Sequence, residues 1–154
     1  MSTFTKNFII FFILNFAALG IGGFLMGDGP TGDWYQGINK APWTPPGWVF
    51  GAAWTTIMLC FSLFMAYLKQ AESSNSIWFL FGLQWILNVG WNPIFFDQHN
   101  MLLGLITIIS LTVLVGYFLF RYRSVVGWKS LLIAPYFIWL CIATSLNWYA
   151  LVSN

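Results

Sequence analysis

The chain has 154 residues, of which 59% are hydrophobic, 21% aromatic and only 6% charged. Its length suits one compact domain, so we expect a single membrane domain over residues 1–154. The formal net charge of +2 is too small to indicate a nucleic-acid-binding protein.

Long apolar runs without any Asp, Glu, Lys, Arg or His follow one another along the chain, and there are five of them. A bilayer core takes about 20 helical residues to cross, and backbone groups inside it must be hydrogen-bonded within the segment. We therefore predict an all-α integral membrane protein, a five-transmembrane-helix bundle in contact with the lipid bilayer. Its helices are expected at about 8–26, 47–68, 76–96, 101–120 and 130–152. The first run is longer than the apolar part of a usual signal peptide, and no clear cleavage motif follows it, so we expect it to be retained.

Residues 27–46 (GDGPTGDWYQGINKAPWTPP) join the first two runs. Gly and Pro near both ends exclude one regular helix, and Asp33 is placed to cap a short helical turn. Pro45 and Pro46 restrict the chain as it enters the second run. Two interpretations remain: a structured loop that covers the mouth of the bundle, or an interfacial anchor.

In the third run, Gln84, Asn88 and Asn92 follow one another at a spacing of four residues, so their amides share one helix face. We expect this face to point inward, because an amide that faces lipid is costly. The amides could serve as polar groups of a ligand site or as interhelical hydrogen bonds that hold the bundle together.

In the last run, Tyr136, Trp139, Ala143 and Asn147 share one face. At ~1.5 Å per helical residue, Ala143, Trp54 and the third-run amide at position 88 all lie roughly 10–13 Å from the membrane end that carries the 27–46 loop. Large rings, amides and a small residue at one level predict a flat, mostly apolar cavity, typical of a hydrophobic-ligand site. Core packing is the alternative.

The basic residues divide unevenly between the two sides of the membrane. Lys40 alone lies on the side of the 27–46 loop and the C-terminus, and the other side carries Lys6, Lys69, Arg121, Arg123 and Lys129. Positive residues favour the cytoplasmic side, so we expect a cytoplasmic N-terminus and an extracytoplasmic loop and C-terminus. Tryptophans near the run ends are expected to form interfacial belts: Trp48, Trp78, Trp91, Trp128 and Trp148.

Groups for proton relay, metal binding or hydrolysis are scarce. No span carries an acidic residue or a histidine, which argues against ion-coupled transport. His99, the only histidine, lies near Asp97, and we expect it to cap a helix or be solvated rather than bind a metal. Cys60 and Cys141 lie inside spans and are expected to be free thiols. We expect no metal site and no tightly bound cofactor.

Three segments carry a resemblance to a known family: 34–46 (WYQGINKAPWTPP), 87–96 (LNVGWNPIFF) and 135–147 (PYFIWLCIATSLN). They resemble the translocator protein or tryptophan-rich sensory protein family, also called the peripheral benzodiazepine receptor family. The resemblance implies a homodimer of five-helix bundles with a pocket beneath the first loop. The family's ligand classes are porphyrins, sterols and synthetic isoquinoline carboxamides or benzodiazepines. Some bacterial members of the family promote light-dependent porphyrin breakdown.

The resemblance also implies specific ligand-binding residues. Trp54 and Asn88 would donate hydrogen bonds to a ligand carbonyl, and Trp139 matches the tryptophan tied to porphyrin chemistry. The family's sterol motif is incomplete, because no basic residue follows Tyr149. The positions that match the pocket are Tyr35, Pro45, Trp54, Asn88, Trp91, Trp139 and Ala143.

From these features we expect a receptor or sensor of a bacterial cell membrane that binds tetrapyrroles as ligands rather than as cofactors. The resemblance leaves light-dependent porphyrin degradation at Trp139 open, and a conventional enzyme is not expected. The main alternative is a small exporter of porphyrins or sterols. The lack of intramembrane charge and of inverted repeats argues against active transport. A further alternative is a structural adaptor whose cavity is only core.

Overall fold

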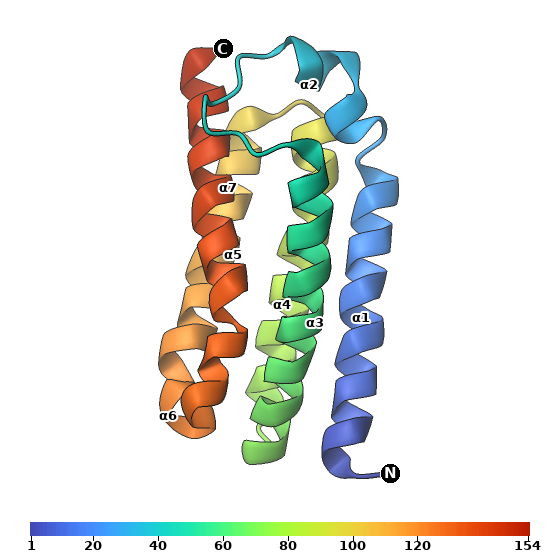
Figure 1. The fold of residues 1–154 in the computed structure, drawn as a ribbon, viewed down its shortest axis with the longest axis vertical. Helices are drawn as coiled ribbons and strands as arrows, with labels where there is room; N and C mark the ends of the chain where they lie inside the picture. The colour runs from blue at the N-terminus through green and yellow to red at the C-terminus, as the bar shows by residue number, and fades with distance from the viewer.

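The structure, a computed structural model, describes residues 1–154 and is helical throughout, with no strand. Long helices run side by side along the molecule (Figure 1). They are α1 (Thr3–Leu25), α3 (Gly47–Ala71), α4 (Asn75–Asn92), α5 (Met101–Arg121) and α7 (Ala134–Ser153). Short elements join them: η1 (Gly29–Thr31), α2 (Asp33–Gly37), the π-helical turn η2 (Pro93–Asp97), α6 (Arg123–Val126) and η3 (Gly127–Leu132).

By length and composition, α1, α3, α5 and α7 are suited to cross a membrane. This confirms an all-helical, multi-pass membrane protein. Helix α4 is the exception among the long helices, because its 18 residues include the amides of Gln84, Asn88 and Asn92. The count of five spans therefore stays a prediction.

Local sequence explains where the helices begin and end. Helix α1 begins before the apolar run does, because the Ser2 hydroxyl accepts a hydrogen bond from the Thr5 amide at 3.1 Å and caps it. Helix α7 begins at Ala134 instead of 130, since Pro135 suits the first turn of a helix. In the loop, Gly32 occupies the cap position of α2, so Asp33 lies within its first turn and does not cap it.

The long helices form a ring. Helix α1 packs on α3 and α4, α5 packs on α4 and α7, and a smaller contact between α3 and α7 closes the ring. Gly22 lets α1 approach α4 closely, because a Cβ there would lie 2.6 Å from Nδ2 of Asn92. The N-terminus and α6 lie at one end, which we call the basic end, while α2 and the C-terminus lie at the other, the lid end (Figure 1).

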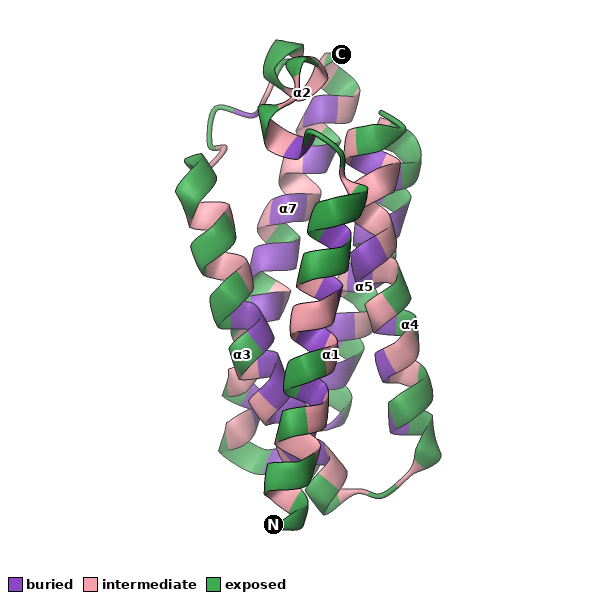
Figure 2. Ribbon diagram, turned by 90° about the vertical axis from the view of Figure 1, so that its right-hand side faces the viewer, coloured by how far each residue is buried: buried purple, intermediate pink, exposed green.

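The interior is packed unevenly between these ends. Buried residues lie on the inward sides of the helices (Figure 2). On α3, every buried residue lies between Ile57 and Leu68, and none lies in its first ten residues. The tightly packed core, with Phe61, Phe64 and Tyr136 fully buried, therefore includes only the part of α3 toward the basic end. The lid end of α3 thus contributes no buried residue to this core.

Candidate functional site

Residues 27–46, which we call the lid loop, cross the lid end of the bundle (Figure 1). Trp34 of α2 stacks on His99, with 4.3 Å between the ring centroids and 9° between the planes. His99 has a φ of 54°, a left-handed conformation that is uncommon for a residue other than Gly. The expected helix cap falls instead to Asn100, whose side chain accepts a hydrogen bond from the Leu103 amide at 2.9 Å. His99 stays exposed and holds the lid loop through its ring.

A second attachment ties the middle of the lid loop to the end of α7. The Asn39 amide N–H donates to Oδ1 of Asn154 at 2.9 Å, and Nδ2 of Asn154 donates back to the Asn39 carbonyl at 3.2 Å. Nδ2 of Asn39 also donates to the Ser153 carbonyl at 2.9 Å. These three hydrogen bonds fix the loop's backbone against the C-terminus.

A third attachment lies closer to α3. Nε1 of Trp43 donates to the Ser145 hydroxyl at 3.0 Å, and its ring meets Tyr149 edge-on at 5.5 Å. Both partners belong to α7. Because the loop is held at several points across the bundle, its geometry favours a cover over the mouth rather than an anchor in the interface.

Beneath the lid loop lies a cavity of about 40 Å³. A pocket for a drug-sized ligand has a volume of about 300–1,000 Å³. The cavity is therefore closed down in this conformation, and a large ligand needs the lid loop or the surrounding rings to move. The lining is mostly apolar and comes from the lid loop, α3, α4, η2 and α7: Tyr35, Ile38, Lys40, Ala41, Thr44, Phe50, Trp91, Phe95, Phe96, Ala143, Leu146, Asn147 and Ala150.

Three of the site residues expected from the sequence, Tyr35, Trp91 and Ala143, line this cavity. Ala143 supplies a flat, small wall on α7, and Trp91 donates from Nε1 to Oδ1 of Asn147 at 3.2 Å. Trp91 is thus part of the interior rather than of an interfacial belt. The structure brings these three residues together from segments distant in sequence.

The other four, Pro45, Trp54, Asn88 and Trp139, do not line the cavity. Trp139 meets the ring of Phe50, which does line the cavity, edge-on at 5.3 Å. Trp54 points deeper, toward Tyr136, with 5.9 Å between ring centroids.

The three side-chain amides of α4 differ in their hydrogen bonds. Gln84 donates from Nε2 to the Tyr136 hydroxyl at 2.6 Å and so links α4 to α7. Asn92 donates to the Asn88 carbonyl of its own helix at 3.1 Å. The Asn88 side chain is only 7% exposed and has no hydrogen-bond partner in the chain. The expected inward face is confirmed. Oε1 of Gln84 has no partner either, but Asn88 is the only one of the three whose side chain makes no hydrogen bond at all.

Lys40 is the only charged residue that lines the cavity. Its ammonium donates to the carbonyls of Tyr35 at 2.9 Å and Gln36 at 3.1 Å, at the C-terminal end of α2, where a positive charge is favourable. An ammonium has three N–H groups, so one stays free. Burial raises the pKa of the Tyr35 hydroxyl above its ordinary value, because desolvation disfavours the phenolate.

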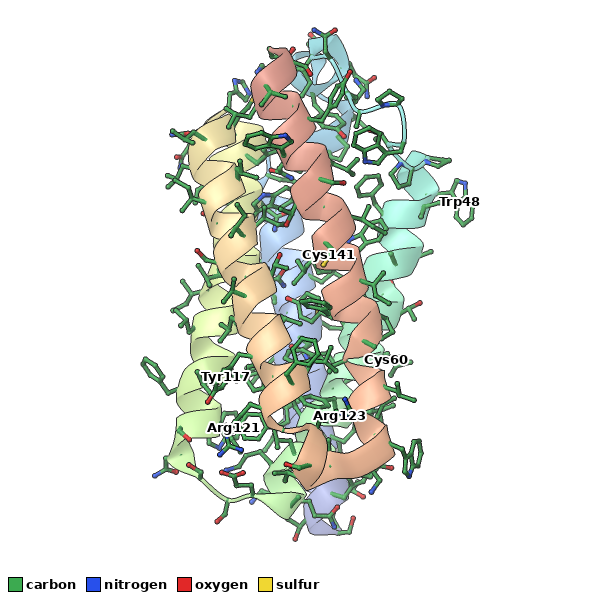
Figure 3. The ribbon with its side chains drawn as sticks, turned by 90° about the vertical axis from the view of Figure 1, so that its left-hand side faces the viewer. Trp48, Cys60, Tyr117, Arg121, Arg123 and Cys141 are labelled. Atoms are coloured by element: carbon green, nitrogen blue, oxygen red, sulfur yellow. The ribbon has the colours of Figure 1, made fainter.

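Some of the lining was not identified from the sequence. Phe50 lies one helical turn before Trp54, and this spacing is the signal that could have pointed to it. Lys40 belongs to the 34–46 motif and to the topology argument, but the sequence does not predict it in the lining. No group of three or more His, Cys, Asp or Glu side chains could hold a metal ion. Trp48, Trp128 and Trp148 are more than half exposed on the outer surface, where a belt requires them (Trp48 is labelled in Figure 3).

Comparison with known proteins gives a consistent result. The model of the TspO/MBR family matches residues 10–152. The tryptophan-rich sensory protein of Cereibacter sphaeroides is 32% identical over 122 residues, covering 79% of this chain and 77% of that protein. Tryptophan-rich protein TspO of Chlorobaculum tepidum is 30% identical over 142 residues, covering 89% of each chain. The human translocator protein is 28% identical over 130 residues, covering 81% of this chain and 76% of that protein.

Proposed function

Since this chain belongs to the TspO/MBR family of membrane proteins, we propose that it is a receptor or sensor for porphyrins and similar flat hydrophobic molecules. The observation that carries the proposal is the aromatic-lined cavity beneath the lid loop, with Lys40 as its single charged residue. Aromatic walls suit the faces of a macrocycle, and an ammonium suits a carboxylate at its edge. The free amide of Asn88 is a further polar contact for a ligand that enters more deeply.

The same proposal includes the arrangement in the membrane. All five long helices span the bilayer, with α4 shielded by its neighbours on its amide face, and two chains associate as a homodimer. The basic end carries five basic residues and one acidic residue, whereas the lid end carries one basic and three acidic residues. The basic end therefore faces the cytoplasm, and the lid loop opens on the other side.

The topology is tested by a C-terminal fusion to a reporter that fluoresces only in the cytoplasm. We expect the fusion to stay dark, because Asn154 lies at the lid end, while a fusion at the N-terminus fluoresces. Equal expression of the two fusions is checked with an antibody. A bright C-terminal fusion would reverse the orientation.

Lys40 is expected to select ligands that carry a carboxylate. Lys40→Gln keeps a donor but removes the charge, and a hydrogen bond to a charged group contributes about 1.5–3 kcal/mol. Because Lys40 is only half-buried, we expect the lower part of this range, about a tenfold loss of affinity for protoporphyrin IX. Binding of its dimethyl ester should not change. Tryptophan fluorescence quenching in the dark measures both, and Lys69→Gln at the basic end is the matched control.

The experiment that tests the receptor proposal is a titration with protoporphyrin IX in the dark, repeated under light with product analysis. Saturable dark binding without new products supports a receptor, and no binding rejects it. If light generates products, Trp139 is the expected participant, since an indole is easily oxidised. Trp139→Phe should then keep dark affinity, because Trp139 does not line the cavity and Phe retains most of the ring's contact area, but should lower product yield steeply. If Trp139→Phe lowers porphyrin affinity and product yield equally, Trp139 contributes to binding only and takes no part in the photochemistry.

A further inference from the structure

A second feature lies on the opposite half of the molecule, where α5 and α7 face the bilayer near the basic end. Two open grooves of about 500 Å³ each lie on this surface, and Phe120 lines both. The first lies over Gly116, beside Tyr117 and Phe137. The second lies beside Leu119, Leu131 and the start of α7.

Each groove ends at an arginine. Arg121 lines the first groove and Arg123 the second, on either side of Tyr122 at the turn from α5 into α6 (Figure 3). Neither guanidinium has a hydrogen-bond or ion-pair partner in the chain, and Arg121 only lies over the Tyr122 ring, 5.6 Å from its centroid. Two positive charges therefore line two mostly apolar grooves, with their N–H donors free.

Ser130 is a third polar group of this surface. It lines the second groove and is only 6% exposed as a residue, but its hydroxyl oxygen is not a buried atom and has no hydrogen-bond partner in the chain. The hydroxyl is therefore free to donate to a ligand in the groove. The exposed ring of Trp128 beside it, 76% accessible, places this part of the groove at the depth of the lipid headgroups.

We propose that this surface, formed by the two grooves, Arg121, Arg123 and Ser130, binds one anionic phospholipid. The two acyl chains lie in the two grooves and straddle Phe120, and the phosphate accepts hydrogen bonds from both guanidiniums. The Ser130 hydroxyl donates to an oxygen of the glycerol region. Two apolar channels match two acyl chains, and basic pockets between helices at a membrane surface bind anionic headgroups. The site is independent of the porphyrin proposal.

The test uses the full-length protein in detergent, incubated with equal amounts of dioleoyl phosphatidylglycerol and dioleoyl phosphatidylcholine. Native mass spectrometry gives the ratio of the two bound lipids. We expect phosphatidylglycerol to be preferred and the preference to fall about fivefold for each arginine removed in Arg121→Gln and Arg123→Gln. Both side chains are exposed and unpaired, so these variants should fold normally.

The control is the double variant Lys6→Gln/Lys69→Gln, which removes the same charge at the same end but away from the grooves. It should retain the preference that Arg121→Gln/Arg123→Gln loses. An equal loss in both would show a general effect of surface charge and overturn the site. Excess glycerol phosphate should not displace the bound lipid. Full displacement would show that the site binds the anionic headgroup alone and would overturn the proposed role of the acyl chains. A wild-type protein without preference would also overturn it.

Discussion

Replacing Ala143 with Phe is expected to abolish porphyrin binding, with a loss of at least about 100-fold in affinity, or ~2.7 kcal/mol. Ala143 forms the small wall of a cavity that already measures only about 40 Å³. A ring at this position would occupy the space that a ligand must enter, even after the lid loop opens. Overpacking costs about 1–3 kcal/mol of stability, which a membrane bundle should tolerate.

The measurement is the dark titration with protoporphyrin IX, together with the thermal unfolding midpoint of each variant. Ala52→Phe is the matched control, since Ala52 lies on the exposed side of α3 and does not line the cavity. The control should bind like wild type. If Ala143→Phe unfolds at the wild-type temperature and still binds normally, the cavity beneath the lid loop is not the ligand site.

Much of the helical framework could be predicted from hydrophobicity alone, because a membrane leaves few choices to a long apolar run. The inward direction of Gln84, Asn88 and Asn92 followed from their spacing and from the cost of facing lipid. Helix ends were less predictable, since they depend on single residues such as Ser2 and Pro135.

The candidate site could be predicted only in part, and the reason is physical. Helical spacing tells which face a residue occupies but not which neighbouring side chain lies in front of it. The sequence predicts that Trp139 binds the ligand; in the structure Trp139 contacts Phe50 of another helix, and only Phe50 of the two lines the closed cavity. The stacking of Trp34 on His99 joins segments 65 residues apart, and no local sequence pattern predicts it. The closed state of the cavity is likewise a property of tertiary packing.

Because the cavity is closed, we propose that the lid loop opens before a large ligand binds. Opening breaks the three hydrogen bonds between Asn39 and the end of α7 and the bond from Trp43 to Ser145. At ~0.5–1.5 kcal/mol for each bond, the closed state is favoured by about 2–6 kcal/mol before the ring contacts are counted. A ligand that needs the open state binds with an affinity reduced by the small open fraction.

A disulfide between positions 39 and 154 tests this step, because the side chain of Asn154 already reaches the backbone of Asn39. We would make Asn39→Cys/Asn154→Cys in a background where the two native cysteines, Cys60 and Cys141, are replaced by Ala. The cross-link fixes the lid loop to α7 when oxidised and releases it when reduced. Each sample therefore serves as its own control, with closure of the bond verified by the mass of the protein.

The decisive measurement is the association rate of protoporphyrin IX in the dark, before and after reduction of this disulfide. The oxidised protein should bind at least ~100-fold more slowly, which corresponds to ~2.7 kcal/mol and lies within the range expected for lid opening. Reduction should restore binding to the wild-type rate or faster, since the native hydrogen bonds at both positions are gone. Equal association rates in the oxidised and reduced protein would contradict this mechanism. The lid loop would then not be the gate, and the ligand would enter elsewhere, for example between α3 and α7, which share only a small contact.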